Sequence, residues 1–182
     1  WSPLPAGAAS YSLRVVDAAG VPWDYTLTGP PPEAYRPERW QFYVADLRRP
    51  GLGRTPPARR PDRSAPLRLE AIVLRPGLAP QVAERASVWL DAVTATSAPA
   101  LPPDWWEVGL PQPVLVESFE SLDAWELMQG QTAQPSPGAL SRSEARARDG
   151  RAAAQLTFLR QRGSFLLYGL RTRGDGGRLS LL

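Results

Sequence analysis

The stretch "ESFESLDAWELMQG", residues 117–130, decides the fold. It reads as a short strand around Phe119 and Glu120, a small polar turn, and a second strand that begins at Trp125. Such a phrase is typical of the opening of a β domain. Only 52 residues follow it, since 182 − 130 = 52. The strands that complete this sheet must therefore be sought earlier in the chain.

Composition favours an all-β fold. The 182 residues suffice for one domain or two small ones, and 43% of them are hydrophobic, which excludes a wholly disordered chain. The chain contains 21 prolines. Because proline removes a hydrogen bond from a helix and clashes with the preceding turn, a mainly helical protein is not expected.

Several residue types are missing. The sequence has no Cys, His, Lys or Asn, and all 21 of its basic residues are arginine, which is typical of a GC-rich genome. Without Cys and His, disulfides, thiol catalysis, a Ser-His-Asp triad and a His-rich zinc site are excluded. Paired carboxylates could still act as glycosidase acids, but we expect Asp91, Glu117 and Glu120 to have structural roles.

Charge gives no support for a nucleic-acid partner. The net charge is only +3, although the sequence pI is 9.8. Residues 48–63 carry six arginines but no aromatic side chain on which a base could stack. We interpret this range as a solvated loop, and the "RGD" at 173–175 as a chance triplet.

The first half of the chain contains five runs in which apolar and polar residues alternate, as in half-buried strands. In one of them, Trp40, Phe42 and Val44 share a face, opposite Gln41 and Tyr43. The five predicted strands are 11–17, 22–28, 39–47, 66–76 and 86–96.

The second half of the chain, after a Pro-rich connection at 96–113, shows the same alternation of apolar and polar residues. Residues 144–156 are rich in the good helix formers Ala and Arg. The Asp149-Gly150 pair and the alternation of Leu156 and Phe158 favour two strands joined by a turn instead. The predicted strands are 114–120, 125–128, 138–147, 151–159 and 164–172.

A family resemblance accounts for both halves. "FESLDAWEL" (119–127) with "GALSRSEARARDGRAAAQLTF" (138–158) resembles the N-terminal half of a galactose-binding-like jelly roll, the β-sandwich common among carbohydrate-binding modules. "LRVVDAAG", "ERWQFYVADL", "LRLEAIVLR" and "ASVWLDAVTAT", within 11–96, are similar to its C-terminal half. The resemblance implies a jelly-roll sandwich whose halves stand in reversed order.

The predicted organisation is residues 1–96 as a C-terminal half, 97–113 as a linker, and 114–182 as an N-terminal half, together one composite domain. Neither half completes a sandwich alone. Strand 114–120 is expected to pair with strand 86–96 across the linker. Three arrangements stay open: a fragment of two tandem jelly rolls closing on itself, the same completion in a strand-exchanged dimer, and a naturally permuted domain.

The resemblance also implies a metal site. Modules of this family often hold a structural calcium ion where the first and last strands meet. Transferred by motif, its ligands here are Glu120 and Asp91, with the Asp149-Gly150 turn. Calcium requires six to eight oxygen ligands, so the alternative is that both carboxylates cap strand ends or pair with arginine.

Aromatic residues are the candidates for ligand binding, because sugars stack their apolar faces on Trp and Tyr rings. We expect Trp23, Trp40 and Trp125 to be core residues. The remaining candidates for a ligand-binding surface are Trp89, Tyr43, Trp105 and Trp106.

The sequence thus predicts a non-catalytic, extracytoplasmic β-sandwich. No Met begins the chain, and we expect a longer, membrane-anchored parent. Paired jelly rolls of this Arg-, Pro- and Ala-rich kind resemble the extracytoplasmic segments of FtsX-like ABC transporter permeases, which implies a structural, sensory or protein-interaction role. The alternative is a carbohydrate-binding module of a secreted or surface protein, with a glycan as its partner.

Overall fold

The protein is described by a computed structural model that covers residues 9–49, 52–53, 60–76, 84–129, 138–160, 168–173 and 180–181. In these ranges nearly all of the regular secondary structure is β-strand, which confirms the predicted all-β class. Its helical residues there are η1, Pro32–Ala34, and α1, Trp105–Val108, and neither helix is long and apolar enough to cross a membrane. The strands are β1 Ala9–Val16, β2 Pro22–Thr26, β3 Leu52–Gly53, β4 Leu67–Pro76, β5 Glu84–Leu90, β6 Val93–Ala95, β7 Val114–Glu117, β8 Trp125–Gln129, β9 Ala139–Ser143, β10 Ala153–Arg160, β11 Tyr168–Thr172 and β12 Ser180–Leu181.

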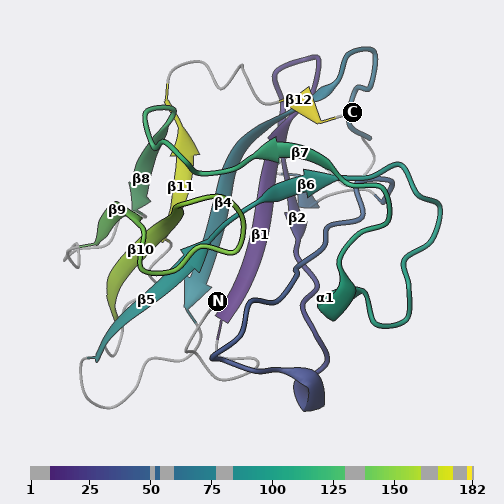
Figure 1. Cartoon of the computed structure of the whole chain (residues 1–182). Coiled ribbons are helices and arrows are strands. Elements are labelled where there is room, and N and C mark those ends of the chain that lie inside the picture. Colours follow the sequence, from purple (N-terminus) through teal and green to yellow (C-terminus); the bar gives the residue numbers. More distant parts are fainter. Residues whose placement is uncertain are drawn as a thin grey trace.

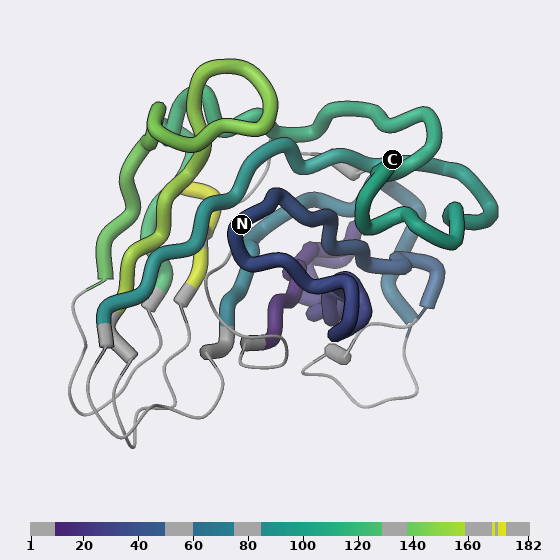
Figure 2. Tube along the Cα trace, turned by 60° about the horizontal axis from the view of Figure 1, so that its bottom comes forward, coloured from purple at the N-terminus to yellow at the C-terminus, as the bar shows by residue number. Residues whose placement is uncertain are grey.

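The strands form two layers. One layer is a sheet in the order β3-β2-β1-β4-β11-β8, with β12 also paired to β4. The other contains the three-stranded sheet β5-β10-β9 and the pair β6-β7. In Figure 1, β5 and β6 run as one diagonal path in front of β4 and β1. The tilted view of Figure 2 separates the two layers.

Early and late strands pair directly in both layers. β10 pairs with β5 over seven residues, from Ala154↔Leu90 to Arg160↔Glu84. β11 pairs with β4, and β6 pairs with β7 across the Pro-rich connection. This last pairing is the one predicted from the sequence. Since all three ladders lie within a single chain, the two halves close on each other in this structure.

The core lies between the layers and is built from both halves. Tyr11 and Leu74 from the larger sheet pack with Val88, Leu156 and Phe158 from the smaller one, and all five side chains are buried. A second cluster unites the β1 and β2 side chains with Phe119 and Trp125. Because both sheets turn apolar side chains inward, the arrangement is a β-sandwich.

Hydrogen bonds of Glu117 fix the conformation of residues 117–125. Its Oε1 accepts a hydrogen bond of 2.6 Å from the Phe119 backbone N–H, and its Oε2 accepts one of 3.0 Å from Trp125 Nε1. Phe119 adopts a positive φ of 56°, and its ring lies 5.4 Å from that of Trp125. Both rings are fully buried. One carboxylate therefore ties the end of β7 to the start of β8.

The predicted strand 39–47 is wrong. Within it only Val44 makes a ladder contact, an isolated bridge to Thr28, and the Phe42 N–H donates to the Trp106 carbonyl at 3.3 Å. Apart from this bridge, the segment does not join a sheet. Trp40, expected in the core beside Trp23 and Trp125, is consequently only half-buried, whereas the other two are fully enclosed.

The predicted strand 86–96 is interrupted. β5 ends at Leu90 and β6 begins at Val93, because Asp91 and Ala92 leave the ladder and Ala92 has a positive φ of 51°. Residues 144–152 form a loop between β9 and β10, so the turn interpretation is confirmed there and the helical alternative is wrong. Residues 50, 51 and 54–59 of the predicted loop 48–63, residues 164–167, and Gly174 and Asp175 of the RGD triplet lie outside the described residues.

The Glu117 contacts predict a specific loss of stability. In Glu117→Gln the side-chain NH₂ cannot accept a hydrogen bond, so either Phe119 N–H or Trp125 Nε1 is left unsatisfied in a buried place. We expect the free energy of unfolding to fall by about 1–3 kcal/mol in urea denaturation. Glu126→Gln, which removes an exposed pair with Arg171, is the control and should cost about 0–1 kcal/mol. Equal losses in the two variants would contradict the role of Glu117.

Candidate functional site

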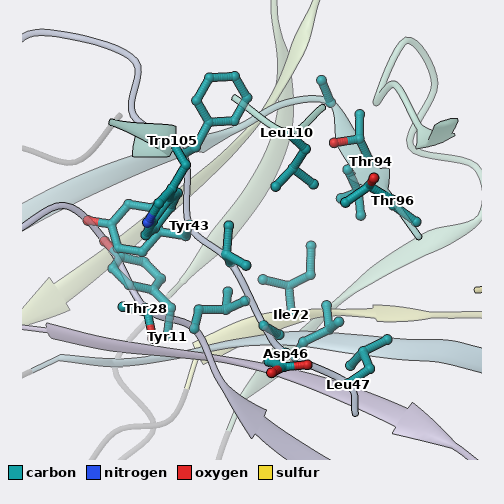
Figure 3. A pocket seen from close by; sticks show the side chains of 18 of the residues that line it. Tyr11, Thr28, Tyr43, Asp46, Leu47, Ile72, Thr94, Thr96, Trp105 and Leu110 are labelled. Carbon is teal, nitrogen blue, oxygen red and sulfur yellow. The ribbon is translucent and has the colours of Figure 1, made fainter. Parts of the chain in front are cut away.

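A cavity of about 920 Å³ lies between the two layers. Its floor comes from β1 and β4, its roof from β5 and β6, and its side from residues 40–49. Figure 3 shows side chains from these elements facing a common space. Residues 40–49 border the cavity without forming a strand of either layer.

Aromatic side chains gather at one end of the cavity. The Tyr11 and Tyr43 ring centroids are 4.8 Å apart, and Trp105 lies beside them in Figure 3. Space for the Tyr43 ring depends on Gly29, where a Cβ would overlap Tyr43 Cε1. Burial raises the pKa of Tyr43, and the nearby Tyr11 raises it further, so its hydroxyl stays protonated at neutral pH.

The position of the Phe42 ring, which also lines the cavity, depends on a second glycine, Gly109. Gly109 follows α1 with a φ of 86°, and a Cβ there would come within 2.6 Å of Phe42 Cζ. The guanidinium carbon of Arg148 lies 4.3 Å from the centroid of the same Phe42 ring, a cation–π contact. The loop after β9 thereby meets the 40–49 segment at the cavity.

Charged side chains mark the other end of the cavity. Asp46 Oδ1 accepts a hydrogen bond from Arg48 Nε at 2.9 Å, and Asp46 Oδ2 lies 3.4 Å from Arg49 Nε. The Arg48 hydrogen bond lowers the pKa of Asp46. Arg63 donates to the Leu47 carbonyl. This end, seen around Asp46 and Leu47 in Figure 3, thus combines one carboxylate with three guanidinium groups.

A second surface lies on the outer face of the β5-β10-β9 sheet. Trp89 donates from Nε1 to Ser143 Oγ at 3.4 Å, and the Arg146 guanidinium carbon lies 5.1 Å from its ring centroid. Gln155, opposite Trp89 in the ladder, donates to Ser87 Oγ at 3.4 Å. This Trp89 face therefore combines one partly exposed indole with hydroxyl, amide and guanidinium groups.

The predicted metal ligands Asp91 and Glu120 meet around one turn, residues 148–152. Asp91 Oδ2 accepts hydrogen bonds from the N–H groups of Arg148 at 2.7 Å and Asp149 at 3.0 Å. Glu120 Oε1 accepts from Arg151 N at 2.6 Å and Ala152 N at 3.3 Å. The turn therefore presents backbone donors to both carboxylates.

Gly150, at the centre of that turn, is required for it. Its φ is 68°, a region that favours glycine, and a Cβ there would overlap Glu120 Oε1. The Arg151 backbone hydrogen bond lowers the pKa of Glu120, and the Ala152 N–H and Arg142 lower it further. The carboxylate of Glu120 is therefore held ionised against the turn.

The calcium expectation can be compared with this geometry. Each carboxylate gives one oxygen to backbone N–H groups, and Glu120 Oε2 lies 3.6 Å from Arg142. Asp91 Oδ1 is buried and has no hydrogen-bond partner, so it is the oxygen that a cation would contact first. The described residues contain no cluster of three or more acidic or other metal-ligating side chains. The fit to a six- to eight-coordinate ion is poor as the atoms stand, and calcium stays a prediction.

The structure brings together some of the residues predicted from the sequence. Tyr43, Trp105 and Asp91 contribute to the lining of the cavity, and Trp89 also borders it although its ring makes the contacts of the Trp89 face. Trp106 does not, although its ring packs edge-on against Trp105 with centroids 5.9 Å apart. Glu120 does not line the cavity and bonds instead to the N–H groups of Arg151 and Ala152.

Sequence reasoning missed the floor and the charged end of the cavity. Tyr11 lies in β1 as predicted, but its contact with Tyr43 joins two segments that are distant in the sequence, so no local pattern indicates it. Asp46 carries a local signal, because the "ADLRR" run places two arginines within three residues of one acid.

Comparison of the chain with protein-family models, with curated proteins and with solved structures finds no match.

The contacts of Glu120 predict how stability changes with pH. A lowered folded-state pKa contributes stability that is complete above the unfolded value, about 4.3, and is lost as pH falls through the folded value. We expect the melting temperature of Glu120→Gln to depend less on pH below about 4.3 than that of the wild type. Glu144→Gln, which removes only an exposed pair with Arg142, is the control. Parallel pH curves for wild type and Glu120→Gln would contradict the assignment.

Proposed function

We propose that this chain is a non-catalytic, extracytoplasmic domain of a larger bacterial membrane protein of the permease kind, in which it senses a small ligand. The observation that carries the proposal is the cavity between the sheets. Its volume lies within the range of about 300–1,000 Å³ typical of small-molecule sites. A site bounded by both layers lets a bound molecule change how the layers sit together, which is what a sensory domain requires.

We also propose that the sandwich is a jelly roll whose halves stand in reversed order. In support, β7, the first strand of the late half, pairs with β6, the last strand of the early half. β10 then pairs with β5 next to that junction. Joined in this way, the halves close on each other within one chain, whereas strand exchange would need the same ladders to form between two copies.

Ligand sensing fits the residues better than catalysis does. The two carboxylates that meet at the 148–152 turn accept backbone hydrogen bonds, and Asp46 is paired with arginines. A general acid needs a raised pKa, yet the pKa values of Glu120 and Asp46 are lowered. These acids are therefore suited to holding loops in place.

The location can be tested in the full-length parent protein. A site-specific protease sequence inserted at the exposed turn of Glu38 and Arg39 should be cut when protease is added outside intact spheroplasts. We expect the parent's sequence to contain membrane-spanning stretches of about 18 or more apolar residues. A cytoplasmic marker must stay uncut in the same sample. Cleavage only after lysis would overturn the extracytoplasmic location.

The second candidate function, carbohydrate binding, is favoured by the Trp89 face. A partly exposed indole with hydroxyl, amide and guanidinium groups around it matches the needs of a sugar, whose C–H faces are apolar and whose hydroxyls require polar partners. It is a single aromatic ring, so it would hold one sugar unit.

A glycan array decides between the two candidates. If the Trp89 face binds a sugar, Trp89→Ala should lower the affinity at least about tenfold, because the stacking surface is lost. Trp105→Ala is the matched control, since Trp105 belongs to the cavity and not to this face. Absence of binding to any glycan, or an equal loss in both variants, would contradict a sugar site at Trp89.

A further inference from the structure

The cavity has two chemically different ends, and this asymmetry restricts its ligand. Figure 3 places Tyr11, Tyr43 and Trp105 at one end, and Asp46 and Leu47 at the other. Ile72 lies beside Asp46, while Leu110, Thr94 and Thr96 lie on the opposite side of the space. A ligand that fills the whole space therefore meets aromatic rings at one end and charged groups at the other, with mainly aliphatic side chains along its length. Such a ligand is amphipathic, with one polar head.

The charges at the cavity determine the sign of that head. Four arginines and two aspartates line it, namely Arg48, Arg49, Arg63, Arg148, Asp46 and Asp91. At the charged end three guanidinium groups face one carboxylate, so this end carries a net positive charge of about two. Arginine side chains bind carboxylates and phosphates through paired N–H donors.

The Arg48 and Arg49 side chains are 65% and 84% exposed, while that of Asp46 is 31% exposed. The cations therefore extend toward solvent beyond the acid that pairs with them. Arg48 already donates to Asp46 and to the Pro99 carbonyl, and Arg63 donates to the Leu47 carbonyl, so an acidic head group would use the remaining N–H groups of these side chains and Arg49. The apolar part of the same molecule then passes inward past Leu47 and Ile72.

We propose that the cavity binds an amphipathic anion with a long apolar body, of the fatty-acid class, with its acidic head at Arg48, Arg49 and Arg63. This inference rests on the proposed sensory function and names its ligand class. Burial of the apolar body supplies most of the binding free energy, and the arginines select the charge of the head.

Isothermal titration calorimetry of the full chain with three matched probes tests the ligand class. The probes are dodecanoate, 1-dodecanol and dodecyltrimethylammonium, which share a chain length and differ in head-group charge. We expect dodecanoate to bind about tenfold more tightly than dodecanol, and the cationic probe to bind most weakly.

Variants separate the two ends of the cavity. The double variant Arg48→Gln/Arg63→Gln should weaken dodecanoate about tenfold and leave dodecanol unchanged. Arg39→Gln is the matched control, because Arg39 is exposed and does not line the cavity. Leu110→Trp fills the middle from a loop position and should weaken both probes. Unchanged melting temperatures verify that each variant is folded.

The outcomes are distinguishable. Equal affinity for dodecanoate and dodecanol would overturn the anionic class while leaving a small-molecule cavity in place. Binding that persists unchanged in Leu110→Trp would place the probe elsewhere and overturn the inference. Absence of heat with all three probes would also overturn it. None of these results changes the protease test, which decides the membrane location independently.

Discussion

Backbone pairing between early and late strands is the constraint on which the rest of this structure depends. β5 and β4 lie before residue 91 in the sequence. β5 pairs with β10 and β4 pairs with β11, and both of these partners lie after residue 152. Each ladder satisfies the polar backbone of a strand whose side chains enter a shared core, so neither half could bury Val88 or Phe158 alone. Contacts so distant in sequence are entropically costly to form, and the common core offsets that cost.

The segments outside the ladders are fixed by side chains that accept hydrogen bonds. Glu117 joins β7 to β8, while Asp91 and Glu120 hold the 148–152 turn. In each case a carboxylate accepts hydrogen bonds from backbone or indole N–H groups that have no strand partner. Charge-assisted bonds of this kind are stronger than neutral ones, which suits positions where the chain reverses direction. Carboxylates that accept hydrogen bonds from N–H groups thus stabilise both the strand connections and the edge of the cavity.

Alternation of apolar and polar residues was sufficient to predict most strands but could not predict what each would pair with. Residues 39–47 alternate as well as β2 does, yet Phe42 donates its N–H to the loop residue Trp106. Alternation in the sequence indicates only that one side of a segment is apolar. A strand also needs a neighbouring strand to pair with, and the position of that strand depends on distant segments. The cavity is lined by segments that are distant in the sequence, so no local pattern could reveal it. Asp91, Glu120 and the Asp149-Gly150 turn are predicted together from the family resemblance, as calcium ligands, and the structure shows both carboxylates bonded to N–H groups of residues 148–152.

The exclusive use of arginine has a consequence for the rim around Asp46. An arginine guanidinium stays protonated at every ordinary pH. The lowered pKa of Asp46 likewise keeps its carboxylate ionised. The electric field at the mouth is therefore constant across ordinary changes of pH. Dissolved ions weaken it instead, since the screening length shortens from about 30 Å at 0.01 M to about 8 Å at 0.15 M. Salinity, not acidity, is thus the environmental variable to which this rim responds.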